Sequence, residues 1–215
     1  MMRVTTCLWN ANAKSHKFST RYDETWVEKL YRGCHRNLTR PFQFVVFTDR
    51  PREFTVPVLQ EPLQSQNPDY GCMIEPFRLG GPMVVMGLDT IILGNIDHLA
   101  AYCEQQGQIA LPRDPYKPER SINAVALVPP GHTNIFADWG GQNDMEWLRE
   151  FDWQPIDDLF PGHIASLKVA HPTLKENYKT MMQADPPKGA RIVYFHGEPK
   201  PDRLMHLEWV REYWR

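Results

Sequence analysis

The chain has 215 residues, 42% of them hydrophobic, and a formal net charge of −2. It is long and apolar enough for one domain with a substantial core. Its net charge gives no overall positive potential that would attract nucleic acid or an anionic membrane. No run reaches the roughly 20 apolar residues of a membrane span, and the amino terminus lacks a signal peptide's apolar core. The four cysteines show neither CxxC pairs nor zinc-ligand spacing. We therefore expect reduced thiols in a cytoplasmic protein without nucleic-acid partners.

The first fifty residues predict a βαβ unit. Residues 3–10 (RVTTCLWN) have the pattern of a strand that ends in polar residues. Residues 42–49 (FQFVVFTD) form a continuous apolar run, which is typical of a strand buried on both faces. Between them, apolar side chains recur every four residues over residues 22–34, which predicts an amphipathic helix. Ser19 or Thr20 is expected to cap the start of this helix.

The rest of the chain continues to alternate between strand and helix patterns. The strand patterns lie in residues 55–60, 108–112, 122–129 and 190–197. The helix patterns lie in residues 72–80, 143–151 and 202–214. Asn143 and Glu146 form a predicted capping box, and Asp202 is expected to cap the last helix. The alternation predicts an α/β fold, with a Rossmann-like, mixed and mostly parallel sheet flanked by helices.

Polar side chains follow several of the apolar runs. They are Asn10, Asp49, Asp89, Asp114 and His196. In open α/β sheets, ligands bind beyond the carboxyl ends of the strands, so these side chains are candidates for a common site. Asp89 stands out because residues 82–97 (PMVVMGLDTIILGNID) are otherwise largely apolar. Burying an unpartnered carboxylate costs several kcal/mol or more, so we expect Asp89 at the mouth of a cleft.

Four motifs, in order along the chain, resemble nucleotide-sugar glycosyltransferases of the GT-A fold, in particular glycosyltransferase family 8 and its bacterial and phage relatives. Residues 87–99 (GLDTIILGNIDHL) resemble the stretch around that family's DxD motif, and residues 194–201 (YFHGEPKP) resemble its HxxGxxKP motif. Between them, residues 121–131 (SINAVALVPPG) resemble its FNSGVM strand, and residues 143–148 (NDMEWL) its DQDxLN segment. With the first two strands, the likeness covers nearly the whole chain. It implies a single GT-A-like domain over residues 1–215.

The resemblance also implies an activity. Such an enzyme transfers a sugar from a nucleotide-diphospho-sugar, most often a UDP-sugar, to a glycan, protein or small-molecule acceptor, with retention of configuration. Mn²⁺ or Mg²⁺ held by carboxylate oxygens stabilises the charge that develops on the β-phosphate. A lysine near the same oxygens adds a positive point charge.

Carried over position by position, the resemblance places catalytic roles on Asp89, the second acid of DxD, and on Asp144, near the transferred sugar. The donor-binding positions that it implies are Asn10, Asp114, Asn123, His196, Gly197 and Lys200.

Two positions depart from the family pattern. Gly87 stands where the first DxD acid is found, and Tyr194 stands where the family has a metal-binding histidine. A tyrosine phenol, with a pKa of about 10, is a poor ligand for Mg²⁺ or Mn²⁺. Residues 194 and 196 of a strand face the same side, so we expect His196 to join Asp89 as a metal ligand.

These departures leave other interpretations open. One is a degenerate nucleotide-sugar-binding protein with little or no turnover. Another is a nucleotidyltransferase, which usually carries a glycine-rich phosphate loop after the first strand. Residues 10–19 (NANAKSHKFS) contain no glycine, which disfavours that second alternative. Trp9, beside the expected cleft, is a candidate for stacking on a base.

Overall fold

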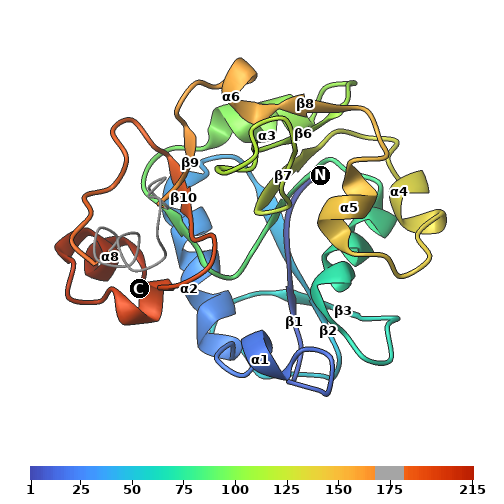
Figure 1. Cartoon of the computed structure of the whole chain (residues 1–215), viewed down its shortest axis with the longest axis horizontal. Helices are drawn as coiled ribbons and strands as arrows, with labels where there is room; N and C mark the ends of the chain where they lie inside the picture. Colours follow the sequence, from blue (N-terminus) through green and yellow to red (C-terminus); the bar gives the residue numbers. More distant parts are fainter. Residues whose placement is uncertain (168–181) are drawn as a thin grey trace.

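The computed structural model describes residues 1–167 and 182–215. Within them, seven strands form the main sheet in the order β3-β2-β1-β4-β7-β6-β8 (Figure 1). The strands are β1 (Met2–Leu8), β2 (Phe42–Thr48), β3 (Leu59–Pro62), β4 (Met83–Met86), β6 (Ile109–Leu111), β7 (Val125–Val128) and β8 (Trp153–Pro155). The pairs β1–β2, β1–β4, β2–β3 and β6–β8 are parallel, whereas β7 is antiparallel to both β4 and β6. The predicted mixed, mostly parallel sheet is therefore confirmed.

A second, smaller sheet has the order β5-β10-β9, and the sequence did not predict it. Its strands are β5 (Thr90–Ile92), β9 (Ile164–Ser166) and β10 (Ile192–Tyr194). Antiparallel pairing places Tyr194 opposite Thr90, so the segment around Asp89 lies beside the segment that follows β10. The strand predicted to reach residue 197 ends at Tyr194. His196 therefore lies in a loop.

The long amphipathic helix is confirmed as α2 (Glu24–Asn37), but its predicted cap is wrong. Residues 16–19 form a separate short helix, α1 (His16–Ser19), so the chain turns before α2 begins. Asp23 caps α2 instead, because its carboxylate accepts a hydrogen bond from the N–H of Thr25 at 3.0 Å.

The remaining helices are mostly short. They are the 3₁₀ helices η1 (Tyr70–Leu79) and η2 (Pro201–Arg203) and the α-helices α3 (Asp97–Cys103), α4 (Asn134–Ala137), α5 (Asp144–Leu148), α6 (Ile156–Leu159) and α8 (Glu208–Tyr213). Asn143 caps α5 as predicted, because its side chain accepts from the N–H groups of Met145 and Glu146. The predicted Asp202 cap is wrong: Asp202 lies in η2, and α8 begins five residues after η2 ends, with Leu207 at its N-cap position.

The two faces of the main sheet carry separate apolar cores. Val84 of β4 belongs to one core, together with side chains of α2 and α3, while Met83 and Val85 belong to the other, with side chains of η1, α4 and α5. Alternate residues of a strand face opposite sides, so the helices form two layers around the sheet. All four cysteines are free and buried. Among the described residues, no helix is both long and apolar enough to cross a membrane.

Candidate functional site

A cavity of about 420 Å³ lies where the carboxyl end of β1 meets the loops after β4 and β10. Residues 7–9, 87–89, 122–124 and 194–197 line it, together with Tyr22 and side chains from α1, η1 and the start of α5. The sequence-predicted residues on its wall are Asp89, Asn123, Asp144, His196, Gly197 and Lys200. The fold thus gathers most of the candidate site residues at the carboxyl-end edge of the sheet.

Asp89 lies on the wall of this cavity and is paired with Lys200. The Lys200 ammonium donates hydrogen bonds to Asp89 Oδ2 and, at 2.5 Å, to the carbonyl oxygen of Phe195. The Asp89 and Lys200 side chains are 19% and 14% exposed, so the pair is only partly screened by water. A lysine ammonium has three N–H donors, and the oxygen atoms of Asp89 and Phe195 accept from two of them.

Asp144 and Asn123 form a second, more deeply buried pair. The Asn123 amide donates to Asp144 Oδ2 at 3.1 Å, and Asp144 is only 5% exposed. Burial raises the pKa of Asp144 to about 6, although the hydrogen bonds from Asn123 and from the backbone N–H of Met145 oppose that shift. The charge at this wall of the cavity therefore changes between mildly acidic and neutral pH.

The side chains around Asp89 are a sparse set of metal ligands. A Cβ atom at Gly87 would lie 2.9 Å from Asp89 Oδ1, so the Asp89 carboxylate fills space beside this position. Burial raises the pKa of the Tyr194 phenol well above its usual value, which keeps the phenol un-ionised. The His196 ring lies in the loop after β10, with its centroid 6.0 Å from that of Tyr116.

Within residues 1–167 and 182–215, no three His, Cys, Asp or Glu side chains gather closely enough to hold a metal ion. Mg²⁺ is commonly bound by one or two carboxylates together with substrate phosphates. With Asp89 as a single carboxylate beside Lys200, this wall would need a bound diphosphate to complete the coordination of a divalent cation. The described residues on the wall do not form a complete cage of their own.

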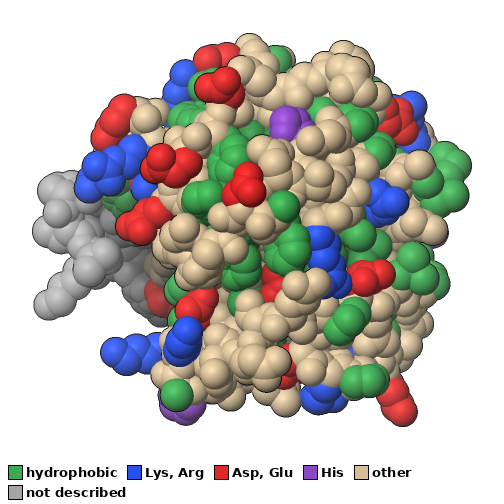
Figure 2. Space-filling view, turned by 90° about the vertical axis from the view of Figure 1, so that its right-hand side faces the viewer, with side chains coloured by type: hydrophobic (Ala, Val, Ile, Leu, Met, Phe, Trp, Pro, Cys, Tyr) green, Lys and Arg blue, Asp and Glu red, His purple; other side chains and the backbone are tan. Residues whose placement is uncertain are grey.

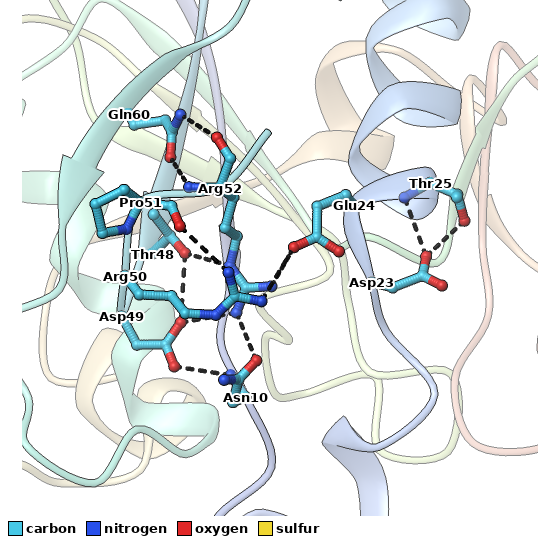
Figure 3. Close-up of polar contacts among 10 residues, drawn as sticks. All are labelled: Asn10, Asp23, Glu24, Thr25, Thr48, Asp49, Arg50, Pro51, Arg52 and Gln60. Carbon is cyan, nitrogen blue, oxygen red and sulfur yellow. Dashed lines mark hydrogen bonds and ion pairs between the residues drawn. The ribbon is translucent and has the colours of Figure 1, made fainter. Parts of the chain in front are cut away.

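Asn10 is held outside the cavity by a buried guanidinium (Figure 3). The Arg52 side chain is 2% exposed and donates to Asn10 Oδ1 at 3.0 Å, to Asp49 Oδ1 at 2.8 Å and to Glu24 Oε1 at 2.8 Å. The backbone N–H of Asn10 donates to Asp49 Oδ2 at 3.0 Å. This network ties the ends of β1 and β2 to the start of α2. The donor-binding role of Asn10 stays a prediction.

Asp114 also lies off the cavity wall. Its carboxylate accepts from the backbone N–H groups of Tyr116 at 2.8 Å and Lys117 at 3.3 Å, which closes a turn after β6. The contact between the rings of Tyr116 and His196 brings this loop to the border of the site. Its role in donor binding likewise stays a prediction.

The cavity wall also carries the aromatic side chains of Trp9, Phe18 and Tyr70, and of these only Trp9 was singled out from the sequence. Phe18 and Tyr70 are stacked, with ring centroids 3.7 Å apart and planes 13° apart, and Trp9 meets Phe18 edge-on. Tyr70 is 52% exposed, which is unusual for a large aromatic side chain. Phe18 lies in the four-residue helix α1 and Tyr70 is the first residue of η1, positions that no sequence periodicity marks. The cavity wall thus combines aromatic side chains with charged ones.

The face that carries α4 and α5 has a mixed charge. In Figure 2, basic and acidic side chains are interspersed over this face, and neither sign forms a continuous area.

No protein-family profile and no curated protein matches the chain. Two crystal structures of the glycosyltransferase GlyE from Streptococcus pneumoniae TIGR4 are similar to it, with TM-scores of 0.60 and 0.61 at 9% identity. They cover 98% and 99% of this chain and 62% and 63% of their own. The bifunctional glycosyltransferase WbbM is similar with a TM-score of 0.56 at 11% identity, over 98% of this chain and 50% of its own.

The chain therefore spans less than two thirds of the GlyE chains and half of the WbbM chain. The TM-scores of 0.56 to 0.61 show a common fold, and identities of 9% to 11% leave the substrates open. The likeness extends over nearly all of the chain, and it agrees with the motif order and the sheet topology. The chain has the GT-A-like fold of glycosyltransferases.

Proposed function

We propose that this protein is a glycosyltransferase that moves a sugar from a nucleotide-diphospho-sugar, first of all a UDP-sugar, to a glycan, protein or small-molecule acceptor. The observation that carries the proposal is the meeting of Asp89, Asp144 and Lys200 in one cavity whose wall also carries Trp9, Phe18 and Tyr70. The likeness of the fold to GlyE and WbbM supports it.

The three parts of a sugar nucleotide match the parts of the cavity. Trp9, Phe18 and Tyr70 offer flat apolar faces on which a base can stack. Lys200, beside the loop that contains Gly197, offers a cation for the diphosphate. The Asn123–Asp144 pair then binds the donor sugar, because its amide and carboxyl groups can form hydrogen bonds with sugar hydroxyl groups.

In the transfer, the bond between C1 of the sugar and the β-phosphate oxygen breaks, and its electron pair leaves with the nucleoside diphosphate. The acceptor hydroxyl oxygen forms the new bond to C1, and its proton passes to the departing phosphate or to solvent. Retention requires attack from the face that the leaving group vacates, so positioning of the acceptor supplies much of the rate acceleration.

Lys200 donates to the phosphate oxygens on which negative charge accumulates. Asp89 and His196 are the residues that would hold Mn²⁺ or Mg²⁺ together with the diphosphate. A cation bound there supplies Lewis-acid stabilisation of the same charge.

The test measures nucleoside diphosphate release from a panel of UDP-, GDP- and ADP-sugars, with and without Mn²⁺, over a panel of acceptors. Asp89→Asn should abolish turnover, whereas the exposed Asp152→Asn, as the matched control, should leave it unchanged. An Asp89→Asn protein with full activity would refute the assignment.

Gly87 and Tyr194 favour a second candidate, a nucleotide-sugar-binding protein with little turnover, because both positions lack a good metal ligand. Tight binding of one sugar nucleotide with no product over the whole acceptor panel would support that candidate.

A further inference from the structure

We propose that Arg21 is a positioning residue for Lys200, because its guanidinium clamps the segment that carries this lysine. Arg21 lies in the connection between α1 and α2, 177 positions before its partner Glu198. The clamp holds the segment where the Lys200 side chain reaches the cavity. This inference rests on the proposed function and deepens it by naming a residue that acts on the diphosphate through Lys200.

Arg21 contacts the segment on both sides of the lysine. Its Nη2 lies 2.6 Å from Glu198 Oε1, and its Nη1 donates to Glu198 Oε2 at 3.1 Å. Two parallel contacts fix the orientation of a carboxylate as well as its distance. The same Nη1 lies 3.7 Å from Asp202 Oδ1. Glu198 comes two positions before Lys200 and Asp202 two positions after it, so one guanidinium restrains the chain on either side.

The segment also has apolar anchors, but these give it little direction. Pro199 and Pro201, on either side of Lys200, are buried. Burial of apolar surface is non-directional, so it holds the segment against the protein without setting its orientation. Gly197, with a φ of +83°, lets the chain turn as it leaves β10. The forked contact with Arg21 adds a directional restraint.

The orientation of the segment decides what the Lys200 ammonium can reach. Nζ donates to Asp89 across the cavity wall and, at 2.5 Å, to the carbonyl oxygen of Phe195. Hydrogen bonds act only within about 3.2 Å, so a displacement of about 1 Å breaks such a contact. A segment that moves freely has to be ordered when a diphosphate binds, and that ordering lowers the affinity.

Arg21 acts on the site indirectly. Neither Arg21 nor Glu198 is among the described residues that line the cavity, although Tyr22 is. The terminal nitrogens of Arg21 are already engaged by a carboxylate. The Arg21 and Glu198 side chains are 26% and 56% exposed, and so exposed a pair contributes little to stability. Loss of the clamp should therefore change donor binding and leave Tm almost unchanged.

The first experiment compares wild type with Arg21→Met by amide hydrogen exchange and by calorimetry with UDP in Mn²⁺. The exchange reporters are the N–H groups of Arg203 and Leu204, which donate at 3.0 Å to carbonyl oxygens of residues 200 and 201. Arg40→Met is the matched control, because Arg40 also pairs with a glutamate at 2.6 Å and lies off the cavity wall.

We expect faster exchange at these reporters and a UDP affinity about 3- to 10-fold lower in Arg21→Met, and wild-type values in the control. Exchange and UDP affinity equal to wild type would overturn the inference and leave the proposed function standing. If the wild type binds none of UDP, GDP, ADP, CDP and dTDP, the proposed function itself fails.

The second experiment asks whether Arg21 acts through Lys200. In a Lys200→Met protein, the further change Arg21→Met should leave UDP affinity unchanged, because the residue that it positions is gone. An equal loss with and without Lys200 would show that Arg21 contacts the nucleotide directly, and would contradict the clamp.

The same cycle with Glu198→Gln decides the question if Lys200→Met does not fold. Arg21→Met should then cost less affinity in the Glu198→Gln protein than in wild type, because both changes remove one contact. Arg21→Lys should bind UDP with intermediate affinity, since an ammonium keeps the charge and loses the fork.

Discussion

Asp144→Asn should stabilise the protein at neutral pH and have little effect near pH 4. Burial raises the pKa of Asp144 from 3.8 to about 6. Between these values the folded protein retains a proton that the unfolded chain has lost. The contribution of Asp144 to the free energy of unfolding therefore falls as the pH rises through this window, and it stays lower above it. The asparagine side chain cannot ionise, so the variant escapes this loss.

The size of the effect follows from the shift. One pKa unit corresponds to about 1.36 kcal/mol, so the ionised carboxylate lowers stability by about 3 kcal/mol above pH 6. The new amide keeps the hydrogen bond from Asn123 but has one acceptor oxygen in place of two, which reduces the gain. We expect a net gain of about 1 to 3 kcal/mol at pH 7.5. For a chain of this size, that gain raises Tm by about 2 to 12 °C.

The assay is urea denaturation of wild type and Asp144→Asn at several pH values from 4 to 8, with the exposed Asp152→Asn as control. The difference in stability between Asp144→Asn and wild type should grow between pH 4 and 6 and then level off. A stability difference that does not vary with pH, or a wild type that is more stable than Asp144→Asn at pH 8, would show that Asp144 is not a desolvated carboxylate.

Three further substitutions separate the functions of the cavity from its scaffold. Asp89→Asn should abolish sugar-nucleotide turnover while Tm stays unchanged or rises, because the carboxylate lies at the cavity wall. A lower Tm in a melting experiment would point to a structural role for Asp89. Arg52→Met should lower the free energy of unfolding, measured in urea, by about 2 to 3 kcal/mol, because the partly exposed carboxylates of Glu24 and Asp49 lose their buried partner. An unchanged free energy would contradict a stabilising role for the Arg52 network. Tyr70→Ala should weaken UDP binding, measured by calorimetry, about fivefold or more through lost stacking, with little change in Tm because Tyr70 is half exposed. A variant that binds UDP as tightly as wild type would show that the base binds elsewhere.

Local patterns in the sequence were sufficient for the main elements. The continuous apolar run of β2 and the four-residue spacing in α2 predicted both elements. The Asn143 cap followed from residues a few positions apart. Such signals are reliable because strand and helix periodicity and capping depend on close neighbours in the chain. The motif order also indicated the GT-A-like fold and pointed to Asp89 and Lys200.

Tertiary structure alone decided which side chains meet. Asp89 and Lys200 are separated by 111 positions, and their contact depends on the pairing of β5 with β10, which no local pattern reveals. Asn10 has the residue type and strand-end position of a ligand-binding side chain, yet Arg52 holds it in another network. The choice of partner for a polar side chain is set by distances between segments remote in sequence, because hydrogen bonds and ion pairs act only over a few ångströms.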